Sequence, residues 1–140
     1  MQLPFHAAFH TPLLATISRK AFGLLPQSIF QKPSVSLIDG QGQIWSPFST
    51  ETEELYNYTL GHQVTNAYDF SNSITVAMKE FCPDKLVLLG PGNSLGGAIG
   101  QIMIQNNWLD IHSKKTFSSR QKENPYLISM GMEEQRKLLC

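Results

Sequence analysis

The sequence lacks the features that mark several classes of protein. Basic and acidic residues are few and balanced, eleven of each, and no segment collects charge of one sign. Nucleic acids and anionic membranes are bound by concentrated basic patches, so we expect neither as a partner. No apolar run approaches the roughly 20 residues that a membrane-spanning helix requires. The N-terminus shows no basic region followed by an apolar run, so we expect no signal peptide.

Cysteine is equally scarce. Cys82 and Cys140 are far apart in the sequence and have neither metal-ligand spacing nor the pattern of a disulfide framework. This usage favours a reducing compartment. His6 and His112 have no second histidine, cysteine or carboxylate at ligand spacing. We therefore expect a soluble, cytoplasmic protein without a bound metal or cofactor.

What is present suffices for one folded domain: of the 140 residues, 41% are hydrophobic and 16% are charged. Apolar periodicity predicts helices over 11–25, from a capping box at 50–53 through 60, over 69–81, over about 94–106 and over 132–139. Shorter runs predict strands at 34–38, 44–45 and 85–90, the last buried on both faces of a parallel sheet. Residues 1–9 can form at most the end of a strand, and Gly61 is expected to begin a polar loop. The pattern indicates an α/β protein.

One histidine lies where its side chain would be held in place. His10 precedes Thr11 and Pro12, and a threonine cap followed by proline at the first helical position favours the start of a helix. A short turn before a capped helix fixes the imidazole, as a general base requires. From the spacing alone, however, a histidine that merely precedes a helix is the preferred interpretation.

The glycine turn at residues 90–97 has four competing interpretations. A dinucleotide fingerprint needs G-x-G-x-x-G, which Gly90, Gly92 and Gly96 miss by one residue. A P-loop needs a Gly-Lys-Ser/Thr ending, which is absent. The structural interpretation, which we favour, is a tight turn after which Asn93 or Ser94 caps the next helix.

The remaining interpretation of this turn is catalytic. Residues 92–96 match G-x-S-x-G, which in a nucleophile elbow places an attacking serine, here Ser94, between a strand and a helix. A histidine would activate the serine. The candidates are His10, His62 and His112. Against this, Pro91 and Gly92 separate the serine from the end of the strand, where a true elbow turns.

Three separated stretches match the motifs of one family in order and spacing. Ala8-Phe9-His10-Thr11-Pro12-Leu13-Leu14 looks like a motif of Phe or Ser, His, a small residue, Pro, then Leu or Met. Gln63-Val64-Thr65-Asn66-Ala67-Tyr68-Asp69-Phe70 is similar to Gln-x-x-x-Pro-Val-x-Trp, with Ala67 and Phe70 at the proline and tryptophan positions. Residues 89–95 are similar to Val-Gly-Pro-Gly-x-x-Leu. Over about residues 3–106 the chain resembles the malonyl-CoA:acyl-carrier-protein transacylases.

The resemblance implies a particular fold. Residues 1–106 would be the C-terminal part of the hydrolase-like acyltransferase core, a short parallel sheet with flanking helices, and residues 107–140 a polar C-terminal extension with a short helix. The family's Gly-His-Ser-Leu-Gly elbow, its malonyl-binding arginine and its oxyanion-hole glutamine have no match here. We therefore expect a fragment that lacks the elbow half and the ferredoxin-like subdomain.

The resemblance also implies an activity, the ping-pong transfer of a malonyl group from malonyl-CoA to the phosphopantetheine thiol of acyl carrier protein in fatty acid or polyketide synthesis. His10 would be the general base, and the backbone carbonyl of Gln63 would orient it in place of a triad carboxylate. Without the nucleophile, the chain would be inactive alone and would need the missing N-terminal half as a partner. Two alternatives stay open: a non-enzymatic module that binds a carrier protein or a subunit, and a serine hydrolase that uses Ser94.

Overall fold

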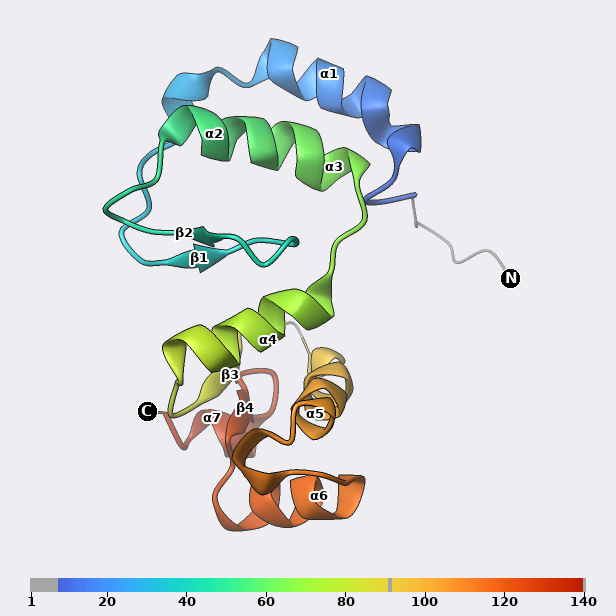
Figure 1. The fold of residues 1–140 in the computed structure, drawn as a ribbon, viewed down its shortest axis with the longest axis vertical. Coiled ribbons are helices and arrows are strands. Elements are labelled where there is room, and N and C mark those ends of the chain that lie inside the picture. The colour runs from blue at the N-terminus through green and yellow to red at the C-terminus, as the bar shows by residue number, and fades with distance from the viewer. Residues whose placement is uncertain (1–7, 91, 140) are drawn as a thin grey trace. The chain divides into compact units, whose positions relative to one another are not determined.

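The computed structural model describes residues 8–90 and 92–139. The chain divides into two compact units between residues 73 and 74, inside helix α4 (Phe70–Phe81) (Figure 1). Each unit combines helices with a two-stranded sheet, so the protein is α/β in the general sense. The predicted boundary after residue 106 falls within the second unit. Residues 1–7, Pro91 and Cys140 lie outside the described residues, and with them His6 and most of the strand end predicted for residues 1–9.

The first unit is built from short elements. In chain order they are η1 (Pro12–Leu14), α1 (Ala15–Leu24), η2 (Gln27–Ile29), β1 (Leu37–Ile38), β2 (Ile44–Trp45), α2 (Thr52–Asn57), the π-helical turn η3 (Tyr58–His62) and α3 (Gln63–Thr65). The strands pair antiparallel, with Leu37 opposite Trp45. Both strands fall where extended segments are predicted, although β1 is shorter than residues 34–38. Helix α1 runs along η3 and α3 (Figure 1).

The capping box predicted at residues 50–53 is absent. The residue before α2 is Glu51, and no side chain caps the helix. The Thr50 hydroxyl donates instead to the Ser46 carbonyl at 2.6 Å. The prediction was wrong because a hydroxyl can also hydrogen-bond a nearby backbone carbonyl, which here lies four residues earlier.

The prediction that Gly61 ends this helix was also wrong, because the helix continues through η3 to Thr65. A π-helical turn shifts the hydrogen-bond register and leaves carbonyls in need of other donors. The Ser18 hydroxyl of α1 donates to the Leu60 carbonyl at 2.6 Å, and the Thr65 hydroxyl donates to the Gly61 carbonyl at 3.0 Å. A Cβ atom at Gly61 would lie 3.4 Å from the Phe22 ring, an ordinary packing distance, so η3 packs against α1 here without requiring a glycine.

Helix α1 exposes much of its apolar surface. Leu13 and Leu24, at either end of the predicted helix, are 80% and 79% exposed, and Ile17 is also exposed. The buried residue of α1 is Ser18. The helix predicted over residues 11–25 therefore forms, as η1 followed by α1, but its apolar residues do not build a core within the first unit.

The second unit contains most of the buried apolar side chains. Besides the rest of α4 it comprises β3 (Leu86–Leu88), α5 (Leu95–Gln105), η4 (Trp108–Asp110), α6 (Lys114–Glu123), β4 (Leu127–Ser129) and α7 (Glu133–Arg136). The helices predicted over 69–81 and 94–106 are confirmed to within one residue at each end. The most deeply buried side chains are Met78, Ile99, Met103, Ile111 and Ile128. None of the helices in the described ranges 8–90 and 92–139 has the length and apolar character needed to cross a membrane.

Strands β3 and β4 form a parallel pair, with Leu86 opposite Leu127. Strand β3 is confirmed, but Val87 is 40% exposed, so the prediction of burial on both faces was wrong. Strand β4 was not predicted, although it is buried along its whole length. The Gln121 amide accepts from the Leu127 N–H at 3.0 Å and donates to the Leu127 carbonyl at 2.8 Å. The Gln135 side chain accepts from the Ser129 N–H at 2.7 Å. Side-chain amides thus occupy the outer edge of β4.

Candidate functional site

The candidate site in the first unit centres on His10, which lies in the turn before η1. Its backbone has a φ of 56°, a left-handed conformation that few residues other than glycine adopt. Such conformations cost free energy and cluster at functional sites. Pro12 opens η1 as predicted. The predicted cap is wrong, because the Thr11 hydroxyl donates to the Ala8 carbonyl at 2.8 Å rather than to the helix.

The His10 ring is held by a backbone carbonyl. Its Nδ1 lies 2.5 Å from the carbonyl oxygen of Gln63, the first residue of α3. Carbonyls in the last turn of a helix have no intrahelical donor, so this oxygen is free to accept. Because a carbonyl can only accept, this contact requires a proton on Nδ1, and in the neutral imidazole the lone pair then lies on Nε2. The structure thus brings together both sequence-predicted site residues in the contact that the resemblance implies, while their catalytic roles remain predictions.

A tyrosine ring completes the support of the imidazole. The centroids of the His10 and Tyr68 rings lie 5.7 Å apart, with the ring planes tilted by 46°. On its other side Tyr68 packs against Gly40, where a Cβ atom would overlap the Tyr68 ring. A glycine at this position therefore lets Tyr68 reach His10. Neither residue is predicted from the sequence as part of the site, although Tyr68 lies within the 63–70 stretch.

The turn after β1 is fixed by a buried carboxylate. Asp39 accepts hydrogen bonds from the backbone N–H of Gln41 at 2.8 Å and from the indole N–H of Trp45 at 3.0 Å. The neighbouring Gly40 N–H donates to the Tyr58 hydroxyl at 2.8 Å. Burial raises the pKa of the Tyr58 phenol and outweighs the opposing effect of the Gly40 N–H. Tyr58 therefore stays protonated at neutral pH.

The residues that support His10 also line a pocket of about 150 Å³ between the hairpin and the α2–α3 stretch. Its walls include Asp39, Trp45, Tyr58, Gln63 and Tyr68. The pocket is part of the first unit alone. It surrounds Gln63 and Tyr68, the two residues that contact the His10 ring, with a mixed aliphatic and aromatic lining.

We expect Tyr58→Phe to destabilise the protein by about 1–3 kcal/mol, because it leaves the Gly40 N–H without its acceptor. Urea unfolding measures the change. The matched control is Tyr56→Phe: the Tyr56 hydroxyl donates to the exposed Leu25 carbonyl, which water can satisfy, so the expected loss is below about 1 kcal/mol. Equal losses for the two variants would contradict the role given to Tyr58.

Among the described residues, no hydroxyl or thiol accompanies the imidazole as a nucleophile. The hydrogen bonds of the described residues pair the His10 ring with the Gln63 carbonyl and with no hydroxyl or thiol. The other two histidine candidates are engaged differently: His62 stacks on Tyr58 with centroids 5.7 Å apart, and His112 Nδ1 pairs with the Asp110 carbonyl at 2.9 Å.

The second candidate, Ser94, has an ordinary backbone. Its φ of −59° and ψ of −30° are those of a right-handed helix, whereas an elbow serine sits on a strained turn. It is exposed, and no histidine hydrogen-bonds to it in the part of the chain that is described. Ser94 precedes α5 without a side-chain capping bond, and the Asn93 side chain donates elsewhere, so the predicted cap is wrong. In the described part of this turn, the residues with positive φ are Gly90 and Gly92, at 101° and 75°.

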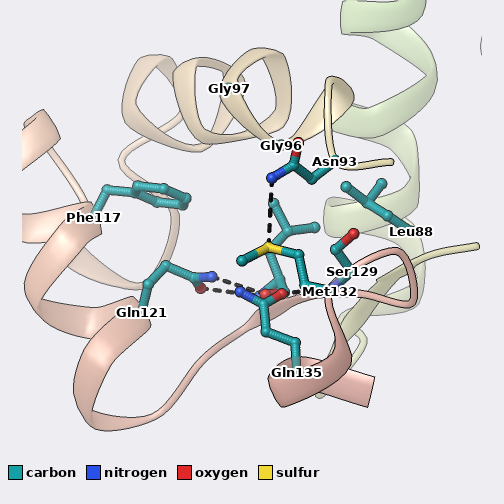
Figure 2. A pocket seen from close by; sticks show the side chains of 10 residues that line it. Leu88, Asn93, Gly96, Gly97, Phe117, Gln121, Ser129, Met132 and Gln135 are labelled. Atoms are coloured by element: carbon teal, nitrogen blue, oxygen red, sulfur yellow. Dashed lines mark hydrogen bonds between the residues drawn. The ribbon is translucent and has the colours of Figure 1, made fainter. Parts of the chain in front are cut away.

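The glycine turn instead packs closely against the segment from Ser129 to Met132 in the second unit. Ser129 Oγ donates to the Gly92 carbonyl at 3.1 Å, and Asn93 Nδ2 lies 3.5 Å from Met132 Sδ. Figure 2 shows these side chains around a pocket of about 230 Å³ beside the start of α5. Gly131 lies so close that a Cβ atom there would be 2.6 Å from the Gly92 oxygen. These contacts support the structural interpretation of the turn.

Comparison of the chain with models of protein families, with curated proteins and with solved structures found no match. The features of this chain that bear on a function are therefore the three sequence motifs and the geometry of the His10 site.

Proposed function

We propose that this chain is the histidine-bearing part of an acyltransferase that moves malonyl groups from malonyl-CoA to the phosphopantetheine thiol of acyl carrier protein. The hydrogen bond between His10 and the Gln63 carbonyl carries the proposal. It joins two motifs 53 residues apart in the sequence, and these are the motifs whose implied roles are the base and the group that orients it.

In the proposed reaction His10 transfers protons at Nε2. A serine from another part of the enzyme attacks the thioester carbonyl of malonyl-CoA while Nε2 takes its proton, and CoA leaves as the thiol after receiving that proton. The carrier thiol then gives its proton to Nε2 and attacks the acyl-serine, and the serine regains a proton from the imidazolium. The Gln63 carbonyl keeps the imidazole in one tautomer and stabilises its cationic form.

The exposed apolar surface of the first unit supports the proposal that another chain or segment supplies the serine. Among residues 8–73 the buried hydrophobic side chains are Trp45 and Leu60, whereas Leu13, Leu24 and Phe48 are about four-fifths exposed or more. A unit with so few buried apolar side chains and such exposed ones gains stability when another structure covers its apolar surface. We assign that role to the nucleophile-bearing half of the acyltransferase.

The finer fold belongs to the same proposal. Residues 1–106 would be the C-terminal part of the hydrolase-like acyltransferase core and residues 107–140 its C-terminal extension, working in the cytoplasm. The parallel pairing of β3 supports an α/β core because parallel strands are typical of such cores, although its partner β4 lies in the segment assigned to the extension.

The test is complementation. We expect the chain alone to transfer no labelled malonyl group from malonyl-CoA to the carrier protein. Addition of the nucleophile-bearing N-terminal half of a malonyl-CoA:acyl-carrier-protein transacylase should produce transfer, while that half alone remains inactive. Formation of a complex without any transfer would contradict the proposal.

Two further readouts separate the alternatives. Binding of the carrier protein to the chain without transfer in the complemented mixture would favour a non-enzymatic carrier-binding module. Labelling of the chain alone by a fluorophosphonate, abolished by Ser94→Ala, would favour a self-contained serine hydrolase.

A further inference from the structure

A pocket in the second unit, separate from the glycine turn, collects buried polar atoms that have no partner. It has a volume of about 640 Å³, within the range of sites for small molecules. Its walls come from the α4–β3 connection, η4 and the end of α6. The unpaired buried side-chain nitrogen and oxygen atoms of the described residues are Trp108 Nε1, Arg120 Nε and Tyr126 Oη, and all three residues line this one pocket.

Unpaired buried polar atoms of this kind are rare and costly. Most buried polar side-chain atoms in proteins have a hydrogen-bond partner, and each exception calls for a specific explanation. Tyr126 is only 4% exposed. Its ring centroid lies 6.5 Å from that of Trp108. The Trp108 indole N–H lies near enough to the Tyr126 hydroxyl to act on its pKa, yet the two groups do not meet the geometry of a hydrogen bond. Three such exceptions in one pocket point to a ligand.

The three groups share one chemistry, because each can donate a hydrogen bond. The indole of Trp108 and the guanidinium of Arg120 can only donate. Burial raises the pKa of the Tyr126 phenol, and this effect outweighs the opposing one of the nearby Trp108 N–H, so the hydroxyl keeps its proton at neutral pH. A ligand that satisfies all three must present acceptor atoms.

The charges around the pocket select the kind of acceptor. Arg120 forms no ion pair or hydrogen bond with the described residues, so its charge is available. Lys85 is engaged, because its Nζ donates to the Asn124 side chain and to the Pro125 carbonyl at 2.8 and 2.6 Å. Asp84 also lines the pocket and disfavours a second negative charge on the ligand. Because the partners of Lys85 are neutral, its charge remains, so Arg120, Lys85 and Asp84 leave a net charge of +1 at the pocket. This net charge suits a monoanion better than a dianion.

We propose that this pocket binds a small monocarboxylate with an apolar body. The guanidinium of Arg120 pairs with the carboxylate in the fork geometry that suits two oxygens. The Trp108 N–H and the Tyr126 hydroxyl donate to the same group, and the apolar body lies against Trp108 and Leu109. Access to the buried donors requires rotation of the Arg120 side chain, which no hydrogen bond holds in place. The inference does not depend on the proposed acyltransferase function.

The backbone around the pocket adds support. Leu109 and Cys82 line it from opposite connections, and both have left-handed backbone conformations, with φ of 52° and 42°. A left-handed conformation at a leucine is strained, and such strain is found at ligand clamps.

The test is a titration of the full chain with sodium benzoate, followed by the indole resonances in a ¹⁵N–¹H NMR spectrum at constant ionic strength. The sequence has two tryptophans, so the second is an internal control. We expect a saturable shift of the Trp108 indole. The Trp45 indole, which donates to Asp39, should not move.

Variants and analogues sharpen the test. Arg120→Gln and benzamide, the neutral analogue, should each weaken binding at least about tenfold, since hydrogen bonds to charged groups are the stronger ones. Lys114→Gln removes one positive charge from the same helix outside the pocket and should leave the affinity unchanged. If Arg120→Gln fails to fold, Arg120→Lys keeps the charge but loses the fork, and should bind more weakly than the unmodified chain.

Three results would overturn the proposal. They are the absence of a Trp108 shift, equal shifts of the two indoles, which indicate a general salt effect, and equal affinity for benzoate and benzamide. Tighter binding of phenyl phosphate than of benzoate would overturn the choice of a monocarboxylate.

Discussion

His10→Ala should reduce malonyl transfer in the complemented enzyme by about 10²–10⁴-fold, the range that general acid–base catalysis contributes. The variant removes Nε2, the only group of this chain to which the proposed mechanism gives a proton. The loss should appear mainly in kcat, since the proposed mechanism gives the imidazole no role in holding malonyl-CoA. Release of CoA during single-turnover acylation measures the step directly.

Two variants serve as controls for this loss. His112→Ala removes a histidine from the second unit whose ring pairs only with a nearby carbonyl, and should leave transfer unchanged. Gln63→Ala should reduce transfer far less than His10→Ala, because the atom that holds the imidazole is a backbone oxygen. Full activity of His10→Ala would rule out the proposed base.

Gly131→Ala should give the largest loss of stability, about 2–3 kcal/mol in the free energy of unfolding. The added Cβ would lie 2.6 Å from the Gly92 oxygen and 2.9 Å from its carbonyl carbon, which are backbone atoms that cannot rotate away. Forcing a methyl group into such a contact displaces the backbone, and overpacking typically costs about 1–3 kcal/mol. Chemical unfolding of the full chain measures the change.

The control for this prediction is Gly97→Ala in α5. A Cβ at Gly97 meets no atom within 4 Å, so the alanine adds no clash. Replacement of a glycine inside a helix by alanine should raise the stability by about 0.5–1 kcal/mol. A Gly131→Ala variant as stable as the unmodified chain would show that the glycine turn and the segment after β4 are not in close contact in solution.

The elements that the sequence predicts well carry their signals locally. Helix α4 begins where Asp69 Oδ1 accepts from the Asn72 N–H at 2.9 Å, and it ends two residues before Pro83. Its apolar residues recur at helical spacing, as do those of α5. The N-terminal cap, the helical spacing of the apolar residues and the terminating proline all lie within about fifteen residues. The bounds of the helix can therefore be derived without the rest of the chain.

The elements that the sequence mispredicts depend on distant partners. The helix continues past Gly61 because a serine in α1 satisfies the Leu60 carbonyl from 42 residues away. Strand β4 is three residues long and has no alternating pattern of its own. It forms because β3 and the amides of Gln121 and Gln135 supply its hydrogen bonds, and such tertiary contacts override local propensity.

The residues of the candidate site also fall into two groups, those that the sequence predicts and those that only the fold reveals. The His10–Gln63 contact could be anticipated because both residues lie in motifs whose order and spacing resemble one family. The contributions of Gly40 and Tyr68 could not, because only the folded first unit shows that the glycine makes room for the tyrosine ring. The pocket lined by Trp108, Arg120 and Tyr126 could not be predicted from the sequence, because these three residues share no motif.

The small sheet of the second unit can grow in one direction only. The backbone N–H and C=O of Leu127 and the N–H of Ser129, on the outer edge of β4, are already hydrogen-bonded to glutamine side chains. These side chains prevent another strand from pairing with β4. Strand β3 has no strand on its other side within residues 74–90 and 92–139, and the exposed Val87 there is neither charged nor a proline, the residues that commonly protect free edges. Any strand that enlarges this sheet must therefore add beside β3, and removal of the Gln121 amide would open a second edge to unwanted pairing.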